Sequence, residues 1–242
     1  MTKKTVASII KAFLNKELPK KLNGNDCYIY NEFSLQHELG IYLRKELGKG
    51  YKVQFERNIK NLQIAINITA KYECESKSEI DIIVLSPKQE RLAAIELKFP
   101  RNEQHPEEMY SFCKDIRFME DVSKKYGPTN GFKKTFCLTL VDDDRFYSAE
   151  GDRRKKKRIY KNFRTNKKKI KDIPYVAKKV HKPTGDDEER KQYLRIKGSH
   201  KIVWKPLKVK NSEKTYKYYF LDVTKSQNKG INSPNKYVFS RT

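Results

Sequence analysis

Two short apolar runs with a turn between them constrain the fold of this chain more than any other feature. Glu79–Ser86 and Arg91–Phe99 are rich in Ile, Val, Leu and Ala, and a four-residue segment, 87–90, opens with proline between them. Segments of this length and composition are typical of β-strands, and a short proline-containing connection favours a hairpin. The sequence therefore predicts two paired antiparallel strands near the middle of the chain.

Three charged residues interrupt these strands, at Asp81, Glu96 and Lys98. If residues 87–90 form the loop, Leu85 faces Leu92 and Asp81 faces Glu96. Opposed residues lie ~5 Å apart on one face, and Lys98 shares that face by the period of two. Two opposed carboxylates repel each other, and oxygen ligands of this kind suit Mg²⁺ or Mn²⁺. The alternative is a pair of surface carboxylates on a sheet edge, with a local Glu96–Lys98 contact.

The rest of the pattern indicates an α/β protein. Helices are expected at Val6–Leu18, ended by Pro19, at Glu32–Leu47, with Asn31 as N-cap and Gly48 as a stop, and at Pro106–Val122. Strands are expected at Tyr51–Glu56 and Thr135–Val141, then at Tyr193–Lys197, Lys201–Leu207 and Thr215–Val223. Leu62–Thr69 alternates as a strand does, although a helix stays open there. Tyr216, Tyr218 and Phe220 alternate on one face and favour core over base stacking.

One helix carries a further carboxylate. Glu38 lies three residues after Leu35 and four before Tyr42, on the apolar stripe of the expected Glu32–Leu47 helix. We expect this carboxylate to point toward the body of the protein. A surface glutamate or a salt-bridge partner is the competing interpretation. The neighbouring Gln36 and His37 are assigned no role.

Together these residues resemble the PD-(D/E)XK nuclease superfamily, which has the restriction-endonuclease-like fold. Asp81 is followed by Glu96-Leu97-Lys98, which matches the E-x-K motif. The order helix, strands, acidic hairpin, helix, strand matches the αβββαβ core over about 31–144. Ile80 stands where the name-giving proline would be. The resemblance implies a mixed central sheet flanked by helices, with a basic, β-containing C-terminal extension.

The resemblance also implies roles for the individual residues. Asp81, Glu96 and the carbonyl of Leu97 would hold Mg²⁺, for which Mn²⁺ would substitute. Lys98 would orient or help to deprotonate the attacking water, and Glu38 would be an auxiliary catalytic carboxylate. Such a site hydrolyses phosphodiester bonds, because a metal polarises the phosphoryl oxygen and a cation offsets charge in the transition state.

The charge of the chain is unevenly distributed. Residues 1–132 carry a net charge of +4, and residues 133–242 carry +20 of the total +24. Within Arg153–Pro183 there are 15 basic residues and one acidic residue. A field this dense favours a polyanion such as nucleic acid, although a solvated or disordered charge run has the same composition. The residues expected to contact DNA phosphates are Arg153, Arg154, Lys155, Lys156, Lys157, Arg158, Lys161, Arg164, Lys167, Lys168 and Lys169.

The sequence thus predicts a Mg²⁺-dependent DNA endonuclease of restriction or defence type. A nuclease core at 1–150 would cleave, and a basic region at 151–242 would grip or recognise DNA. Cutting both strands would require a homodimer or transient pairing. A nucleic-acid-binding protein without catalysis is the rival, and the sequence does not separate RNA from DNA.

The sequence also indicates the cellular location of the protein and the role of its cysteines. No apolar run approaches the ~18 residues that a membrane span needs, and the N-terminus lacks the apolar region of a signal peptide, so a cytoplasmic protein is expected. Four cysteines, Cys27, Cys74, Cys113 and Cys137, form no C-x-x-C pair. Zinc binding is therefore disfavoured, and each cysteine is expected to be a small buried residue.

Overall fold

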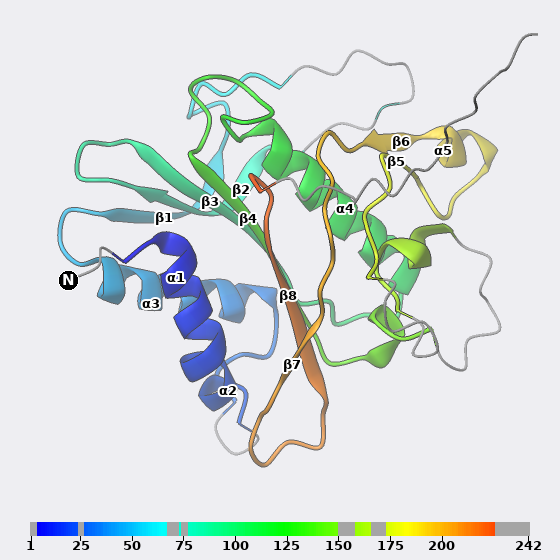
Figure 1. The fold of residues 1–242 in the computed structure, drawn as a ribbon, viewed down its shortest axis with the longest axis horizontal. Helices are drawn as coiled ribbons and strands as arrows, with labels where there is room; N and C mark the ends of the chain where they lie inside the picture. The colour runs from blue at the N-terminus through cyan, green and yellow to red at the C-terminus, as the bar shows by residue number, and fades with distance from the viewer. Residues whose placement is uncertain are drawn as a thin grey trace, which may run out of the picture.

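A mixed six-stranded sheet forms the centre of the molecule (Figure 1). The computed structural model describes residues 4–23, 27–66, 73, 77–149, 158–165 and 173–225. The sheet contains β1 (Lys52–Asn58), β2 (Glu79–Leu85), β3 (Arg91–Lys98), β4 (Lys134–Val141), β8 (Tyr216–Asp222) and β7 (Lys205–Leu207), in the order β1-β2-β3-β4-β8-β7. Only the β3–β4 pair is parallel among these neighbours. The predicted α/β class is confirmed.

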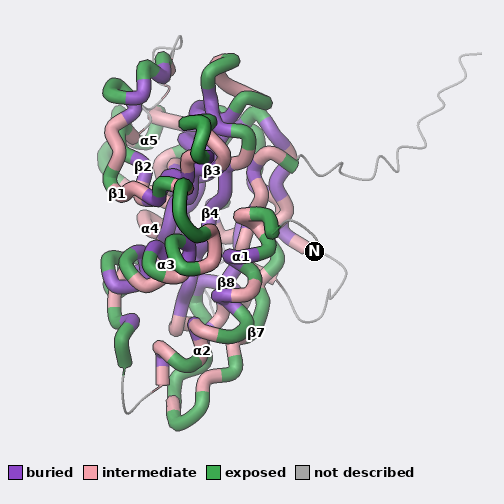
Figure 2. Tube along the Cα trace, turned by 90° about the vertical axis from the view of Figure 1, so that its left-hand side faces the viewer, coloured by how far each residue is buried: buried purple, intermediate pink, exposed green. Residues whose placement is uncertain are grey.

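Helices cover both faces of the sheet. On one face lie α1 (Val6–Ala12), the π-helical turn η1 (Phe13–Glu17), α2 (Leu18–Lys21) and α3 (Glu32–Leu47), and α3 packs against β1, β2 and β3. On the other face α4 (His105–Asp121) packs against β3 and β4, as expected for a crossover between parallel strands. Buried residues follow the central strands between these layers (Figure 2).

The expected helix Glu32–Leu47 is confirmed with its caps. The Asn31 side chain accepts a hydrogen bond from Ser34 N, the Ser34 hydroxyl accepts one from Asn31 N, and Gly48 follows the last turn with a φ of 75°. A φ in this range costs glycine little. This reciprocal cap fixes the first turn of α3, which the site described below depends on.

The β2–β3 register agrees with the prediction at the charged positions. Ile82 pairs with Ile95 and Ile83 with Ala94, which places Asp81 beside Glu96. Near the loop the prediction is wrong by one residue, since Leu85 pairs with Arg91 and not with Leu92. The loop closes early through hydrogen bonds from Ser86 N to Glu90 O and from Gln89 N to Ser86 O, with Gln89 at a φ of 61°. The extra residue forms a bulge and leaves the far end of the hairpin unaffected.

The C-terminal region completes the central sheet. β8 pairs with β4, and β7 pairs with β8, so strands on both sides of residue 150 share one sheet. Tyr216 and Tyr218 are buried and Phe220 packs beside them in the core shared with α1–α3, as predicted. Shorter elements complete this region: η2 (Asp144–Phe146), η3 (Arg158–Asn162), β5 (Lys179–His181), α5 (Asp187–Lys191) and β6 (Tyr193–Arg195), of which β5 and β6 pair with each other.

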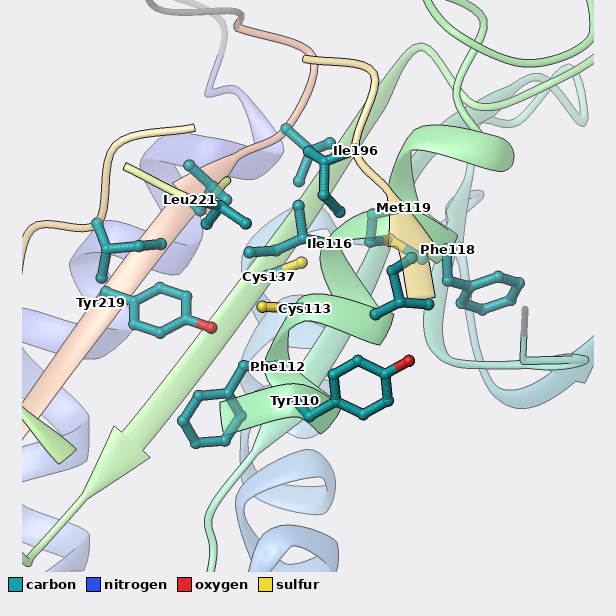
Figure 3. Close-up of a cluster of buried hydrophobic side chains, with 14 of the residues drawn as sticks. Tyr110, Phe112, Cys113, Ile116, Phe118, Met119, Cys137, Ile196, Tyr219 and Leu221 are labelled. Atoms are coloured by element: carbon teal, nitrogen blue, oxygen red, sulfur yellow. The ribbon is translucent and has the colours of Figure 1, made fainter. Parts of the chain in front are cut away.

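The α4 face has its own core, shown in Figure 3. Phe112, Cys113 and Ile116 of α4 face Cys137 of β4 and Tyr219 of β8. Cys113 and Cys137 are free thiols buried in this core, as predicted. Cys27 is exposed and corrects that expectation, and Cys74 lies outside the described residues.

The last turn of α4 is bonded to the segment after β6. Glu120, fully buried, accepts hydrogen bonds from Lys197 N at 2.7 Å and from Gly198 N, and its Oε1 lies 2.7 Å from His200 Nε2. A Cβ on Gly198 would come within 2.9 Å of Glu120 and closer still to His200, so only glycine fits this approach. Helix α4 therefore links the C-terminal region to the sheet.

Two expectations about local structure are wrong. The first helix does not end at Pro19, because Pro19 lies in the first turn of α2 and the chain stays helical to Lys21. A proline needs no N–H partner there, and the wider turn of η1 precedes it. Residues 62–66 are not a strand: Leu62 N bonds to Ile59 O, Gln63 has a φ of 51°, and a turn replaces the ladder. Residues 67–69 lie outside the described part.

None of the described helices is long and apolar enough to cross a membrane.

Candidate functional site

Asp81 is held at the start of the hairpin by the neighbouring strand. Its Oδ2 accepts a hydrogen bond from Leu97 N at 2.7 Å, and its own backbone N–H donates to Glu96 Oε1 at 3.3 Å. From α3, Gln36 Nε2 donates to Asp81 O at 2.7 Å. Burial, partly offset by Lys77 and by the bond from Leu97, raises the pKa of Asp81 to about 7. This carboxylate sits at the boundary between its two protonation states at neutral pH.

Glu96 is the most deeply buried carboxylate on the hairpin. It is 1% exposed, on the β3 face that is turned toward α4. Burial raises its pKa well above the ordinary glutamate value, and the nearby charges of Asp81 and Asp115 raise it further. A carboxylate in this environment is stable as an anion only beside a cation.

Lys98 ends β3 and joins three elements. Its Nζ lies 2.7 Å from Glu32 Oε1 of α3, 3.1 Å from Leu97 O and 3.9 Å from Asp115 Oδ2 of α4. Burial alone would lower the pKa of this ammonium, but Asp115 and Glu32 outweigh it, and the pKa is raised. Lys98 is therefore a fixed positive charge. The predicted register of Asp81 beside Glu96 is confirmed, and Lys98, two residues after Glu96, is linked to them through Asp115.

Sequence reasoning missed two members of this cluster, Lys77 and Asp115. Lys77 Nζ lies 2.7 Å from both Glu96 Oε2 and Asp115 Oδ1 and thus bridges the two carboxylates. Burial opposes the charge of Lys77, but Asp115 and Glu96 keep its pKa well above the ordinary value. A signal for Asp115 existed, since it follows Phe112 by three residues on the apolar stripe of α4. Lys77 precedes its strand in an irregular segment and had no such signal.

The structure places Glu38 away from this cluster. Glu38 Oε2 lies 2.6 Å from Lys21 Nζ of α2, which is the salt-bridge alternative, and no hydrogen bond or ion pair within the described ranges joins it to Asp81, Glu96 or Lys98. Glu32 occupies the expected place in its stead. Six residues separate the two glutamates, which turns them about 120° apart around the helix axis. The prediction that Glu38 is the carboxylate supplied by α3 is therefore wrong, and Glu32, on a different side of the helix, makes the contact.

The cluster is rich in oxygen donors and negative overall. Four carboxylates, Glu32, Asp81, Glu96 and Asp115, face two ammonium groups, so with all groups ionised the formal charge is −2. Hard oxygen ligands and a charge of this sign fit a divalent cation such as Mg²⁺. As the side chains stand, no three acidic, His or Cys groups among the described residues are gathered for a metal ion, and Lys77 Nζ lies between two of the carboxylates.

Three of the predicted DNA-contacting residues lie in the described part, and the other eight, 153–157 and 167–169, lie outside it. Arg158 and Lys161 are exposed on η3. Arg164 is engaged within the fold: its Nε donates to Arg145 O at 2.6 Å, and its guanidinium lies 3.7 Å from the centre of the Tyr160 ring. Of these three, Arg158 and Lys161 are the ones that present their charge to solvent.

No protein-family model, curated protein or solved structure matches this chain. The cluster of Asp81, Glu96, Asp115, Lys77 and Lys98, with Glu32 at its edge, is therefore the main guide to function; we call it the carboxylate–lysine cluster. Glu96 and Asp115 are its buried members.

Proposed function

We propose that this protein is a Mg²⁺-dependent DNA endonuclease of restriction or defence type. The observation that carries the proposal is that Asp81 and buried Glu96 lie together on paired strands, with the ammonium of Lys98 linked to the same group of residues through Asp115. Charged groups gathered at this density lower the stability of a fold. Such clusters are therefore more often found at functional sites than at purely structural positions. The αβββαβ element order of the PD-(D/E)XK resemblance supports the same conclusion.

The residues divide the work as their contacts allow. Asp81 and Glu96, with Leu97 O, would hold Mg²⁺, which when bound supplies a Lewis acid and lowers the pKa of a bound water. Leu97 N fixes the Asp81 carboxylate, so the first ligand is oriented in advance. Lys98, held by Glu32 and Leu97 O, orients the attacking water and offsets negative charge that develops on the phosphoryl oxygens.

Lys77 and Asp115 extend this arrangement. Lys77 offsets the negative charge of Glu96 and Asp115 and so reduces the free-energy cost of burying these two carboxylates. Asp115 is a third carboxylate aimed at the same place, and α4, which carries it, also fastens the C-terminal region through Glu120. The basic C-terminal region would hold the DNA backbone near this site, since phosphate contacts supply most nonspecific affinity. Double-strand cutting would require a homodimer or transient pairing.

Plasmid cleavage tests the proposal. Supercoiled DNA is incubated with the protein in Mg²⁺, in Mn²⁺ and in chelator, alongside Lys98→Met. We expect nicking or linearisation with either metal, none in chelator, and at least a hundredfold lower rate in the variant. Lys133→Met removes an exposed lysine paired with Glu90 and serves as the control. Cleavage by Lys98→Met at the wild-type rate would overturn the assignment of this site.

A nucleic-acid-binding protein without catalysis is the second candidate, and the internal pairing of the cluster favours it. Lys77 bridges Glu96 and Asp115, and Lys98 pairs with Glu32, so the described ions already compensate one another. This candidate predicts salt-sensitive DNA binding that is indifferent to Mg²⁺. Binding measured by fluorescence anisotropy in chelator and in Ca²⁺, at matched ionic strength, for the wild type and Asp81→Asn separates the two. Only a metal site at Asp81 makes the change in affinity between chelator and Ca²⁺ differ between the two proteins, because competition of the cation for DNA phosphates is common to both.

A further inference from the structure

A cavity in the basic region is separate from the carboxylate–lysine cluster. It lies between η3 and β5 with a volume of about 450 Å³, which is within the range of sites for small organic ligands. Its basic lining comes from Arg158, Lys161, Lys179, His181 and Lys182. This places a concave site within a stretch that composition alone describes only as a charge run.

The lining is one-signed. Among the described residues that line the cavity there is no Asp or Glu. The larger cavity, about 670 Å³ beside the ends of β3 and β4, differs, because Glu103, Asp142 and Asp143 line it together with basic residues. The described part of the lining supplies four Lys or Arg side chains and no carboxylate, and such a lining has a positive potential that low-dielectric walls concentrate. The ligand it fits is an anion.

The cations around the cavity differ in how far they are already engaged. Lys182 pairs with Glu189 of α5, and Lys179 Nζ lies 4.0 Å from the centre of the Tyr193 ring. Arg158 and Lys161 make no ion pair within the described part of the chain. Two charges are thus held in place by neighbours, and two exposed charges are available to a ligand.

The cavity also has an apolar side. Ile159, Val180 and Pro183 line it. Ile159 and Val180 are each 4% exposed and belong to the α4-side core, so they form an anchored floor, and Pro183 is the more accessible apolar residue. Asn162 joins two of the lining segments, since its Oδ1 accepts a hydrogen bond from Ala177 N at 3.2 Å. A site with an anchored apolar floor and a cationic rim fits a molecule that has a flat apolar part and an anionic part.

We propose that this cavity binds a single nucleotide unit, with the base beside Pro183 above the floor formed by Ile159 and Val180, and the phosphate on Arg158, Lys161 and Lys179. The unit comes from nucleic acid, as an end or as a nucleotide turned out of the stack, and this part of the inference rests on the proposed function. Bases extruded from a duplex are read in pockets of this kind. The cavity would then recognise one position of the substrate through residues that are not part of the cleavage site.

Binding of deoxyadenosine monophosphate tests the proposal, measured by calorimetry at low salt with inorganic phosphate and deoxyadenosine as comparison ligands. We expect the nucleotide to bind at least tenfold more tightly than either fragment. Ala177→Trp fills the cavity from an exposed position, and it keeps the backbone N–H that donates to Asn162. This variant should weaken nucleotide binding at least tenfold without changing the charge. The pair Arg158→Ala and Lys161→Ala, both exposed, should do the same by removing charge.

The controls distinguish binding in the cavity from nonspecific attraction to the positive charge of the region. Lys208→Ala removes an exposed lysine outside the cavity and should leave binding unchanged. Binding of nucleotide and inorganic phosphate with equal affinity, or wild-type binding by Ala177→Trp, would overturn the proposal. An oligonucleotide that binds while the free nucleotide does not would overturn the single-unit pocket and leave general backbone binding. None of these measurements needs cleavage, so loss of nuclease activity in Lys98→Met and loss of nucleotide binding in Ala177→Trp are separate results.

Discussion

Replacing Asp81 by Asn should stabilise the protein at neutral pH and leave it unchanged in acid. The pKa of Asp81 is about 7 in the folded protein and 3.8 in an unperturbed chain. Folding therefore favours the protonated form. Ionisation of Asp81 therefore lowers the free energy of unfolding as the pH rises from about 4 to about 7, because over that range the unfolded chain releases this proton and the folded protein retains it. The contribution of Asp81 is constant above that range.

The size of this effect follows from the two pKa values. Their difference corresponds to roughly 4 kcal/mol at pH 8. Asparagine keeps an oxygen for the bond from Leu97 N and carries no charge, so the penalty is absent in the variant. In a chain of this length a gain of that size raises the melting temperature by about 8 to 16 °C.

Urea unfolding of the wild type and Asp81→Asn at a series of pH values is the assay. The difference in unfolding free energy between the two proteins should be near zero at pH 4, grow through pH 5 to 7 and level off by pH 8. Taking the difference removes the titration of groups that the two proteins share. A difference that is constant between pH 4 and 8, or that favours the wild type at pH 8, would refute the reasoning about burial at this site.

Further variants probe the rest of the cluster and the basic region. Lys77→Met leaves Glu96 and Asp115 without their shared cation and should lower the free energy of unfolding in urea by about 3 to 5 kcal/mol. Lys21→Met leaves only the more accessible Glu38 without its partner and should lower it by about 1 kcal/mol. Equal losses would contradict the bridging role of Lys77. Glu32→Gln should slow plasmid cleavage at least tenfold and Glu38→Gln should not, and the reverse order would restore the original expectation for α3. Removing Arg158 and Lys161 together should lower the slope of log affinity against log salt for duplex DNA by about two, and an unchanged slope would exclude them from phosphate contact.

The hairpin and its charges could be predicted because they depend on local rules. Period-two alternation fixes which strand residues share a face, and loop length fixes the register to within the bulge at the turn. Asp81, Glu96 and Lys98 could therefore be placed together from sequence. The α3 helix and its cap followed from spacing and from Asn31 in the same way.

The remaining members of the site depend on how distant elements pack. A helical stripe shows which residues face inward but not the rotation at which a helix meets the sheet, which is why Glu38 was chosen where Glu32 makes the contact. Lys77 lies before β2, outside any helix or strand, so no sequence periodicity could predict its position. The position of β8 beside β4 likewise joins residues about 80 positions apart. The cavity at η3 and β5 depends on the same kind of long-range packing.

Plasmid cleavage by Asp81→Asn in Mg²⁺ tests the central claim most directly, namely that the carboxylate–lysine cluster is a catalytic centre. The account predicts a protein that is folded, more stable than the wild type at pH 8, and at least a hundredfold slower in cleavage. Loss of activity then cannot be attributed to unfolding. Wild-type cleavage by this variant, at the stability measured in urea, would contradict the claim.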